Sequence, residues 1–177
     1  MKHFDFKFLR VWMVLWCAGV LFPAAGQGSA GSADVLRLIE KVNDYWQANN
    51  SSKTRAFWDN AAYYTGNMEA YRLTGKVAYY EYSQQWCEHN RWRGANSDDK
   101  RNWKYKTYGE GQDFVLFGDW QICFQTYIDM YNLNPADYKV ARAKEVMTYA
   151  CHLDENKFWW WADALYMVMP LMTKMYK

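Results

Sequence analysis

Apolar residues recur at steps of three and four along most of the chain, which is the spacing of one face of an α-helix. The pattern is clear over residues 33–49, where the apolar positions are Val35, Leu38, Ile39, Val42, Tyr45 and Trp46. The same period predicts further helices over 58–73, 76–92, 119–133, 135–153 and 161–177. No segment shows a convincing strand pattern, so the sequence predicts an all-α fold.

Short links join these helices into hairpins. Thr74-Gly75 separates the second helix from the third, and Gly75 suits the left-handed residue that often ends a helix. Asn134-Pro135 predicts the start of the fifth helix, with Asn as N-cap and Pro at the first helical position. Pro170 should kink the sixth helix. Residues 94–118 show no sustained period but hold several aromatic residues, which predicts a packed loop at a rim or lid.

Three of the helices share an internal repeat. When Asp59, Asp119 and Asp163 are set in register, apolar or aromatic residues follow at offsets of 4–5, 9 and 12, which lie on one helical face. Repeated hairpins that bury a face only against their neighbours form solenoids or closed toroids. The three acids would then gather at one mouth. The alternative is that three helices merely begin with Asp, a favoured cap.

The acid at position 163 follows three consecutive tryptophans, Trp159, Trp160 and Trp161. A carboxylate at a helix N-terminus is stabilised by free N–H groups and by the helix dipole. Aromatic walls around such an acid suit a sugar ring, whose C–H faces pack on indoles. The alternative is an N-capping Asp beside an apolar anchor.

The first part of the chain predicts a processed leader. A basic start is followed by an apolar run over 11–22 that is short for a membrane span, and then by small residues. We therefore predict a signal peptide over 1–26, a linker over 27–32 and one domain over 33–177. The mature protein would be periplasmic or secreted, with no membrane attachment after signal cleavage.

Charge and cysteine usage limit the partners. The leader holds three basic residues and one acidic residue, which account for the whole formal charge of +2. A near-neutral domain lacks the basic field that nucleic acids require. The mature chain would keep Cys87, Cys123 and Cys151, whose spacing from histidines matches no zinc pattern. We interpret them as buried small apolar residues, predict no metal and no cofactor, and leave their disulfide pairing open.

Two stretches then resemble a known family of enzymes. Residues 159–170 read WWWADALYMVMP, similar to the W-W-x-x-D-A-L-F-M-A-x-P signature of glycoside hydrolase families 88 and 105. Residues 118–131 read GDWQICFQTYIDMY, which resembles their other acidic motif, A-D-D-x-x-x-G-Q-x-Y-L-E-L-Y, with departures at Gly118, Trp120 and Phe124. These families are the unsaturated rhamnogalacturonyl and glucuronyl hydrolases. The resemblance runs from about Trp58 to the end.

The resemblance implies both a fold and a reaction. The fold is an (α/α)6 barrel of six helical hairpins, of which this chain would hold about the N-terminal half, and the missing C-terminal half is a possible partner. The substrates are oligosaccharides from polysaccharide lyases with a C4=C5 double bond in the terminal uronic acid, which is hydrated without a metal. Asp163 matches the principal acid/base and Asp119 the second carboxylate. Burial of Asp163 among the tryptophans would raise its pKa. Substrate-binding candidates are Trp58, Asp59, Gln125, His152, Trp160 and Trp161.

Two other readings remain open. Half a barrel lacks half its pocket, so the chain could be an inactive helical-repeat protein that binds glycans or a partner. An ordinary inverting glycosidase on a helical toroid would instead need carboxylates roughly 6.5–9.5 Å apart. His152, near a helix end, could equally be a solvated or capping residue.

Overall fold

The computed structural model describes residues 31–155 and 157–176. The chain divides into two units, 1–35 and 36–177. The predicted signal peptide and the linker up to residue 30 lie outside the described residues, so export stays a prediction. The described part is helical and contains no strand.

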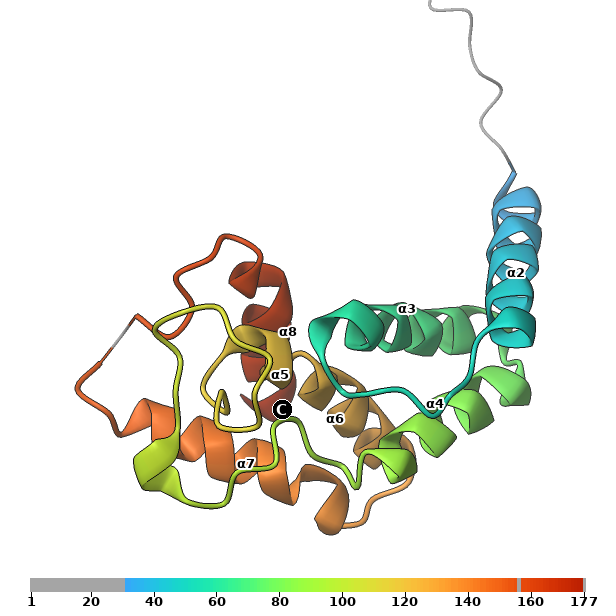
Figure 1. Cartoon of the computed structure of the whole chain (residues 1–177). Helices are drawn as coiled ribbons and strands as arrows, with labels where there is room; N and C mark the ends of the chain where they lie inside the picture. The colour runs from blue at the N-terminus through green and yellow to red at the C-terminus, as the bar shows by residue number, and fades with distance from the viewer. Residues whose placement is uncertain (1–30, 156, 177) are drawn as a thin grey trace, which may run out of the picture. The chain divides into compact units, whose positions relative to one another are not determined.

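The helices follow one another along the chain, with longer segments before α5 and before α8 (Figure 1). They are α2 (Ser32–Asn49), α3 (Trp58–Thr74), α4 (Val77–His89), the 3-10 helix η1 (Lys100–Asn102), α5 (Gly118–Gln121), α6 (Cys123–Leu133), α7 (Tyr138–Cys151) and α8 (Ala164–Tyr176). Gly75 ends α3 with φ of 70°, which confirms the left-handed cap. The all-α prediction is confirmed.

Several predicted boundaries were wrong for local reasons. The predicted helix over 119–133 is divided at Ile122, although the Ile122 backbone stays helical with φ of −55° and ψ of −33°. Asn134 is extended and ends α6, so it does not start the next helix, and α7 begins at Tyr138. The Asn134 carbonyl accepts a hydrogen bond from Nζ of Lys139 (2.7 Å). The third helix stops at His89, because Arg91 and Trp92 adopt positive φ of 54° and 58°.

The helices form an inner and an outer set. Helix α3 packs on α4 and α6, α6 packs on α7 and α8, and α5 packs on α8. The inner helices α3, α6 and α8 are therefore neighbours, while α4 and α7 return the chain on the outside (Figure 1). This is the alternation of helical hairpins in an (α/α)6 barrel, of which the chain holds a part.

An ion-pair network joins the C-terminal parts of the three inner helices. Asp129 of α6 is 2% exposed. One carboxylate oxygen accepts from Nη2 of Arg72 on α3 (2.6 Å), and the other from Nζ of Lys174 on α8 (2.5 Å). Because a buried carboxylate is costly without partners, the two cations fix how α3 and α8 lie against α6.

The chain supplies the hydrogen bond that Pro170 removes from α8. A helical residue at 170 would donate its N–H to the carbonyl of residue 166, but proline has none. Nε2 of Gln125, from α6, donates to the carbonyls of Tyr166 (2.9 Å) and Met167 (2.8 Å). The helix continues through the proline as a result.

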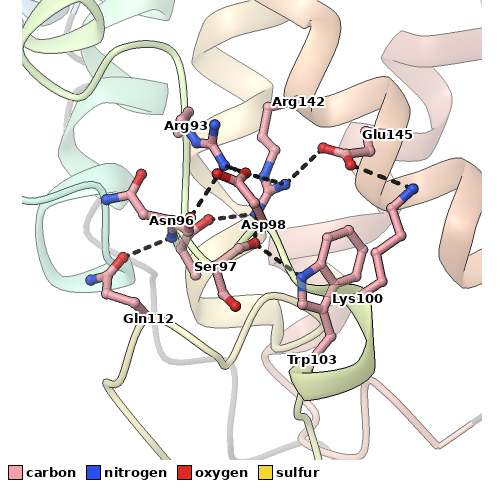
Figure 2. Close-up of polar contacts among 10 residues, drawn as sticks. Arg93, Asn96, Ser97, Asp98, Lys100, Trp103, Gln112, Arg142 and Glu145 are labelled. Carbon is pink, nitrogen blue, oxygen red and sulfur yellow. Dashed lines mark hydrogen bonds and ion pairs between the residues drawn. The ribbon is translucent and has the colours of Figure 1, made fainter.

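The loop between α4 and α5 packs against the helices, as predicted. Trp103, Val115, Leu116 and Phe117 are buried. Arg142 of α7 holds the first part of the loop (Figure 2), since its Nη2 donates to the carbonyls of Ala95 (3.0 Å) and Ser97 (2.6 Å). Its guanidinium also lies over the ring of Trp103, 5.0 Å from the centroid.

We expect Arg142→Met to lower the free energy of unfolding by about 2–3 kcal/mol, because it leaves buried carbonyls without a charged donor. The matched control is Arg101→Met in the same loop, whose side chain is 88% exposed and pairs with Asp99. That change should cost about 0–1 kcal/mol. Urea unfolding of the two variants measures the difference, and equal losses would contradict the anchoring role of Arg142.

Candidate functional site

Three carboxylates lie at the starts of α3, of α5, which leads into the inner helix α6, and of α8. Asp59 is the second residue of α3, and Asp119 is the second residue of α5. Asp163 precedes α8, where its carbonyl accepts the N–H groups of Tyr166 (2.9 Å) and Met167 (3.1 Å). The charges of Asp59 and Asp163 both act on Asp119, so the tertiary structure gathers the acids at one end of the inner helices.

Asp119 is the buried one of these three carboxylates. Its residue surface is 6% exposed. Burial first, then the negative charge of Asp163, raise the pKa of Asp119 to about 6, and Glu110 and Asp59 add to the effect. A carboxyl with this pKa keeps a proton at mildly acidic pH, as a general acid requires.

The expected burial of Asp163 was wrong, since its side chain is exposed. The tryptophans do not close over it. Trp160 and Trp161 are nearly half exposed, and their rings contact each other at a tilt of 33°, with centroids 4.2 Å apart. Trp159 turns inward, and its Nε1 donates to Oε1 of Gln121 (2.8 Å). Burial therefore acts on Asp119, while Asp163 remains open to a ligand.

The tryptophan segment lies against the long loop. Nε1 of Trp160 donates to the carbonyl of Tyr105 (3.2 Å), and the Tyr105 hydroxyl donates to Glu155 (2.8 Å). These residues, with Lys106 and Lys157, line a hollow of about 380 Å³. Trp160 thus presents an aromatic face beside two cations, which suits a sugar ring.

Asp59 and Trp58 border a polar cluster at the start of α3. Asp59 accepts hydrogen bonds from Nη2 (2.8 Å) and Nε (3.3 Å) of Arg55, and Trp58 is 43% exposed. Nη1 of Arg55 reaches Glu110 of the loop (2.5 Å). The Tyr108 hydroxyl donates to the other Glu110 oxygen (2.7 Å).

Two predicted substrate-binding residues make structural contacts. Gln125 is 3% exposed, and its amide nitrogen donates to the two carbonyls of α8. Its role as a sugar-binding residue stays a prediction, because its amide nitrogen already serves α8. His152 caps the end of α7, and its Nδ1 lies 2.7 Å from the carbonyl of Thr148. That contact matches the capping alternative.

Sequence reasoning missed Arg55, Tyr108 and Glu110. Arg55 stands four residues before Asp59, a spacing that brings side chains together on a helix and could have been noticed. Glu110 lies 55 residues from Arg55 in a loop without period, so nothing local indicated their pairing.

The three cysteines that the structure describes are free thiols. Cys87 and Cys123 are buried, as predicted. Cys151 is exposed at the end of α7, so its expected burial was wrong.

The sequence model of glycosyl hydrolase family 88 matches residues 35–177. The chain belongs to this family. Two solved structures are similar to it. One is a polysaccharide lyase, at 62% sequence identity and a TM-score of 0.78, and the match covers 81% of this chain and 40% of that chain. The other is a glycosyl hydrolase of family 88 from Bacteroides vulgatus, at 51% identity and a TM-score of 0.80, covering 81% of this chain and 41% of that chain.

The chain is shorter than the two solved proteins that it matches. It spans about two fifths of the length of the two solved proteins. A search of curated proteins finds no match. In residues 31–155 and 157–176, no helix is long and apolar enough to span a membrane, and no cluster of metal-binding side chains occurs.

The raised pKa of Asp119 predicts how stability depends on pH. Its folded-state pKa of about 6 lies above the ordinary 3.8, so the folded protein binds more protons between these values. The contribution of Asp119 to the free energy of unfolding should therefore fall as pH rises from 4 to about 6. Asp119→Asn removes this penalty and should stabilise the protein at pH 7 but have little effect at pH 4.

Chemical denaturation at both pH values measures the effect. The matched control is Asp137→Asn, an exposed Asp at the start of α7. A difference between wild type and Asp119→Asn that stays constant with pH would contradict the assigned protonation.

Proposed function

We propose that the chain carries part of the active site of an enzyme that hydrates the C4=C5 double bond of a terminal unsaturated uronic acid in oligosaccharides. The main support is the pairing of buried Asp119, with a pKa of about 6, and exposed Asp163 at the starts of neighbouring helices. Membership of family 88 supports a glycoside hydrolase. A binding protein has no need for such a proton-holding pair.

The two carboxyl groups divide the proton transfer between them. Burial and the negative charge of Asp163 raise the pKa of Asp119 to about 6, so Asp119 holds a proton at mildly acidic pH. Asp163 is open to solvent and would meet the sugar, and Asp119 would keep a proton available at the start of the neighbouring helix. The C4=C5 π-bond breaks as C4 takes this proton, and water adds to C5 while a carboxylate removes its proton. The resulting hemiketal opens and releases the remaining sugar.

A second candidate is β-elimination, which produces the same double bond. The solved structure at 62% identity is a polysaccharide lyase, and that identity exceeds the 51% to the family 88 hydrolase. In elimination, a base removes the C5 proton, the C4–O4 bond breaks, and an acid protonates the departing oxygen. A carboxylate and a protonated carboxyl serve this reaction as well as hydration.

One optical assay separates the two reactions, because the C4=C5 double bond conjugated with the carboxylate absorbs in the ultraviolet. A hydrolase lowers the absorbance of unsaturated uronides, whereas a lyase raises that of saturated uronate glycans. Because the chain covers 41% of the Bacteroides vulgatus protein, the assay would be run on the chain alone and on the chain fused to the remaining part of that protein. If the protein binds glycans but the absorbance of both substrates stays constant, the third interpretation is favoured, an inactive glycan-binding protein.

We expect Asp163→Asn to lower turnover in the active form by about 10²–10⁴-fold, the usual loss on removing a general acid or base. Helix content and melting should stay near wild type. Asp137→Asn, at the exposed start of α7, is the matched control and should keep its activity. If Asp163 is only a cap, Asp163→Ala would cost about 0.5–2 kcal/mol of stability and leave turnover intact.

We propose that further hairpins of a barrel pack against the exposed apolar faces of α2 and α8. Leu38, Val42 and Tyr45 on α2 are exposed, as are Leu165, Tyr166 and Met169 on α8. Apolar faces of this kind are normally covered. Further helical hairpins packed on α2 and α8 would cover them and complete the pocket around Asp119 and Asp163.

A further inference from the structure

The polar cluster at the start of α3 holds a cation among carboxylates. The guanidinium of Arg55 binds Asp59 through Nη2 (2.8 Å) and Glu110 through Nη1 (2.5 Å). Both of these carboxylates act on the buried Asp119, so the cluster adjoins the acid pair. We propose that Arg55 binds the carboxylate of a uronic acid, and that Glu110 occupies this position on Arg55 when no sugar is bound. The inference rests on the proposed function, since hydration and elimination both act on a uronic acid.

Electrostatics requires a cation at this place. Asp59, Glu110 and Asp163 all act on Asp119 with negative charge, so the mouth of the site repels an anionic sugar. The planar guanidinium fork matches a carboxylate in two hydrogen bonds. Arg55 is 43% exposed, which leaves it accessible from solvent.

The orientation of Arg55 is fixed before a ligand arrives. Its guanidinium carbon lies 4.7 Å from the ring centroid of Phe57, which is fully buried. Asp59 holds the other side of the fork through two hydrogen bonds. A side chain held in this way loses little further freedom when it binds a carboxylate.

Glu110 accepts one hydrogen bond from Arg55, whereas Asp59 accepts two. The Glu110 side chain is 45% exposed, and exposed ion pairs contribute little because water screens them. It stands between Gly109 and Gly111 at the tip of a loop closed at its base by the bond from the N–H of Lys104 to the carbonyl of Asp113 (2.7 Å). A carboxylate on a loop tip can leave Arg55 without disturbing α3, so an incoming uronate can replace it.

Binding of two monosaccharide probes to the intact chain tests the proposal. D-glucuronate carries the carboxylate, and its methyl ester has the same ring without the charge. Dissociation constants come from nuclear magnetic resonance titration at low ionic strength, where no turnover is needed. Wild type should prefer the acid to the ester.

Variants of the two partners should change this preference in opposite directions. Arg55→Gln should weaken glucuronate binding about 10- to 100-fold, the scale of lost charge-assisted hydrogen bonds, with little change for the ester. Arg55→Lys keeps the charge without the fork and should fall between. Glu110→Gln removes the internal competitor and should tighten glucuronate binding about 2- to 6-fold.

The matched control is Glu69→Gln, which alters the exposed pair of Glu69 with Arg72 on α3 and should leave both affinities unchanged. Circular dichroism confirms that each variant is folded. Equal losses for acid and ester in Arg55→Gln would overturn the proposal, as would no binding of glucuronate to wild type or no gain in Glu110→Gln. The absorbance assay tests the reaction separately. If absorbance stays constant while wild type still prefers glucuronate to its ester, only the proposed reaction is overturned. If the enzyme is active but shows no such preference, only the role of Arg55 is overturned.

Discussion

The inner helices α3, α6 and α8 must be held together against like charges at their starts. Asp59, Asp119 and Asp163 repel one another, and this repulsion is part of the reason that Asp119 keeps its proton. Arg72 and Lys174 form ion pairs with Asp129, one with each carboxylate oxygen. These three residues lie about 10–13 positions after the three acids, or roughly 15–20 Å along a helix. The favourable network at one end offsets the unfavourable cluster at the other, and the packing between the helices makes both possible.

The two central carboxylates differ because the fold treats them differently. Asp119 begins a helix whose residues are all buried, whereas Asp163 stands before α8 and is exposed. Desolvation disfavours the charged form of the first and leaves the second accessible. Two chemically identical groups therefore differ in proton affinity and in accessibility, as the proposed proton transfer requires.

The long loop between α4 and α5 connects the outer layer to the site. Arg142 on an outer helix holds its beginning (Figures 1 and 2). Glu110, near its other end, binds Arg55, which lies just before an inner helix. The part of the loop that Arg142 binds packs against α7, and the part around Glu110 lies beside the carboxylates. This division is typical of a loop that keeps its place in the fold while its tip responds to a ligand.

The sequence by itself determined the helices, their hairpin order and the family. It also aligned the three acids, because a period of three to four residues and a helix-starting Asp are local properties. The boundaries at Asn134 and Ile122 escaped it. Only the tertiary structure decided that Asp119 is buried and Asp163 exposed, that Gln125 replaces the N–H missing at Pro170, and that Glu110 reaches Arg55. Each of these depends on a neighbour 40 or more residues away, and burial and pairing at that range follow from how helices pack, which no local pattern records.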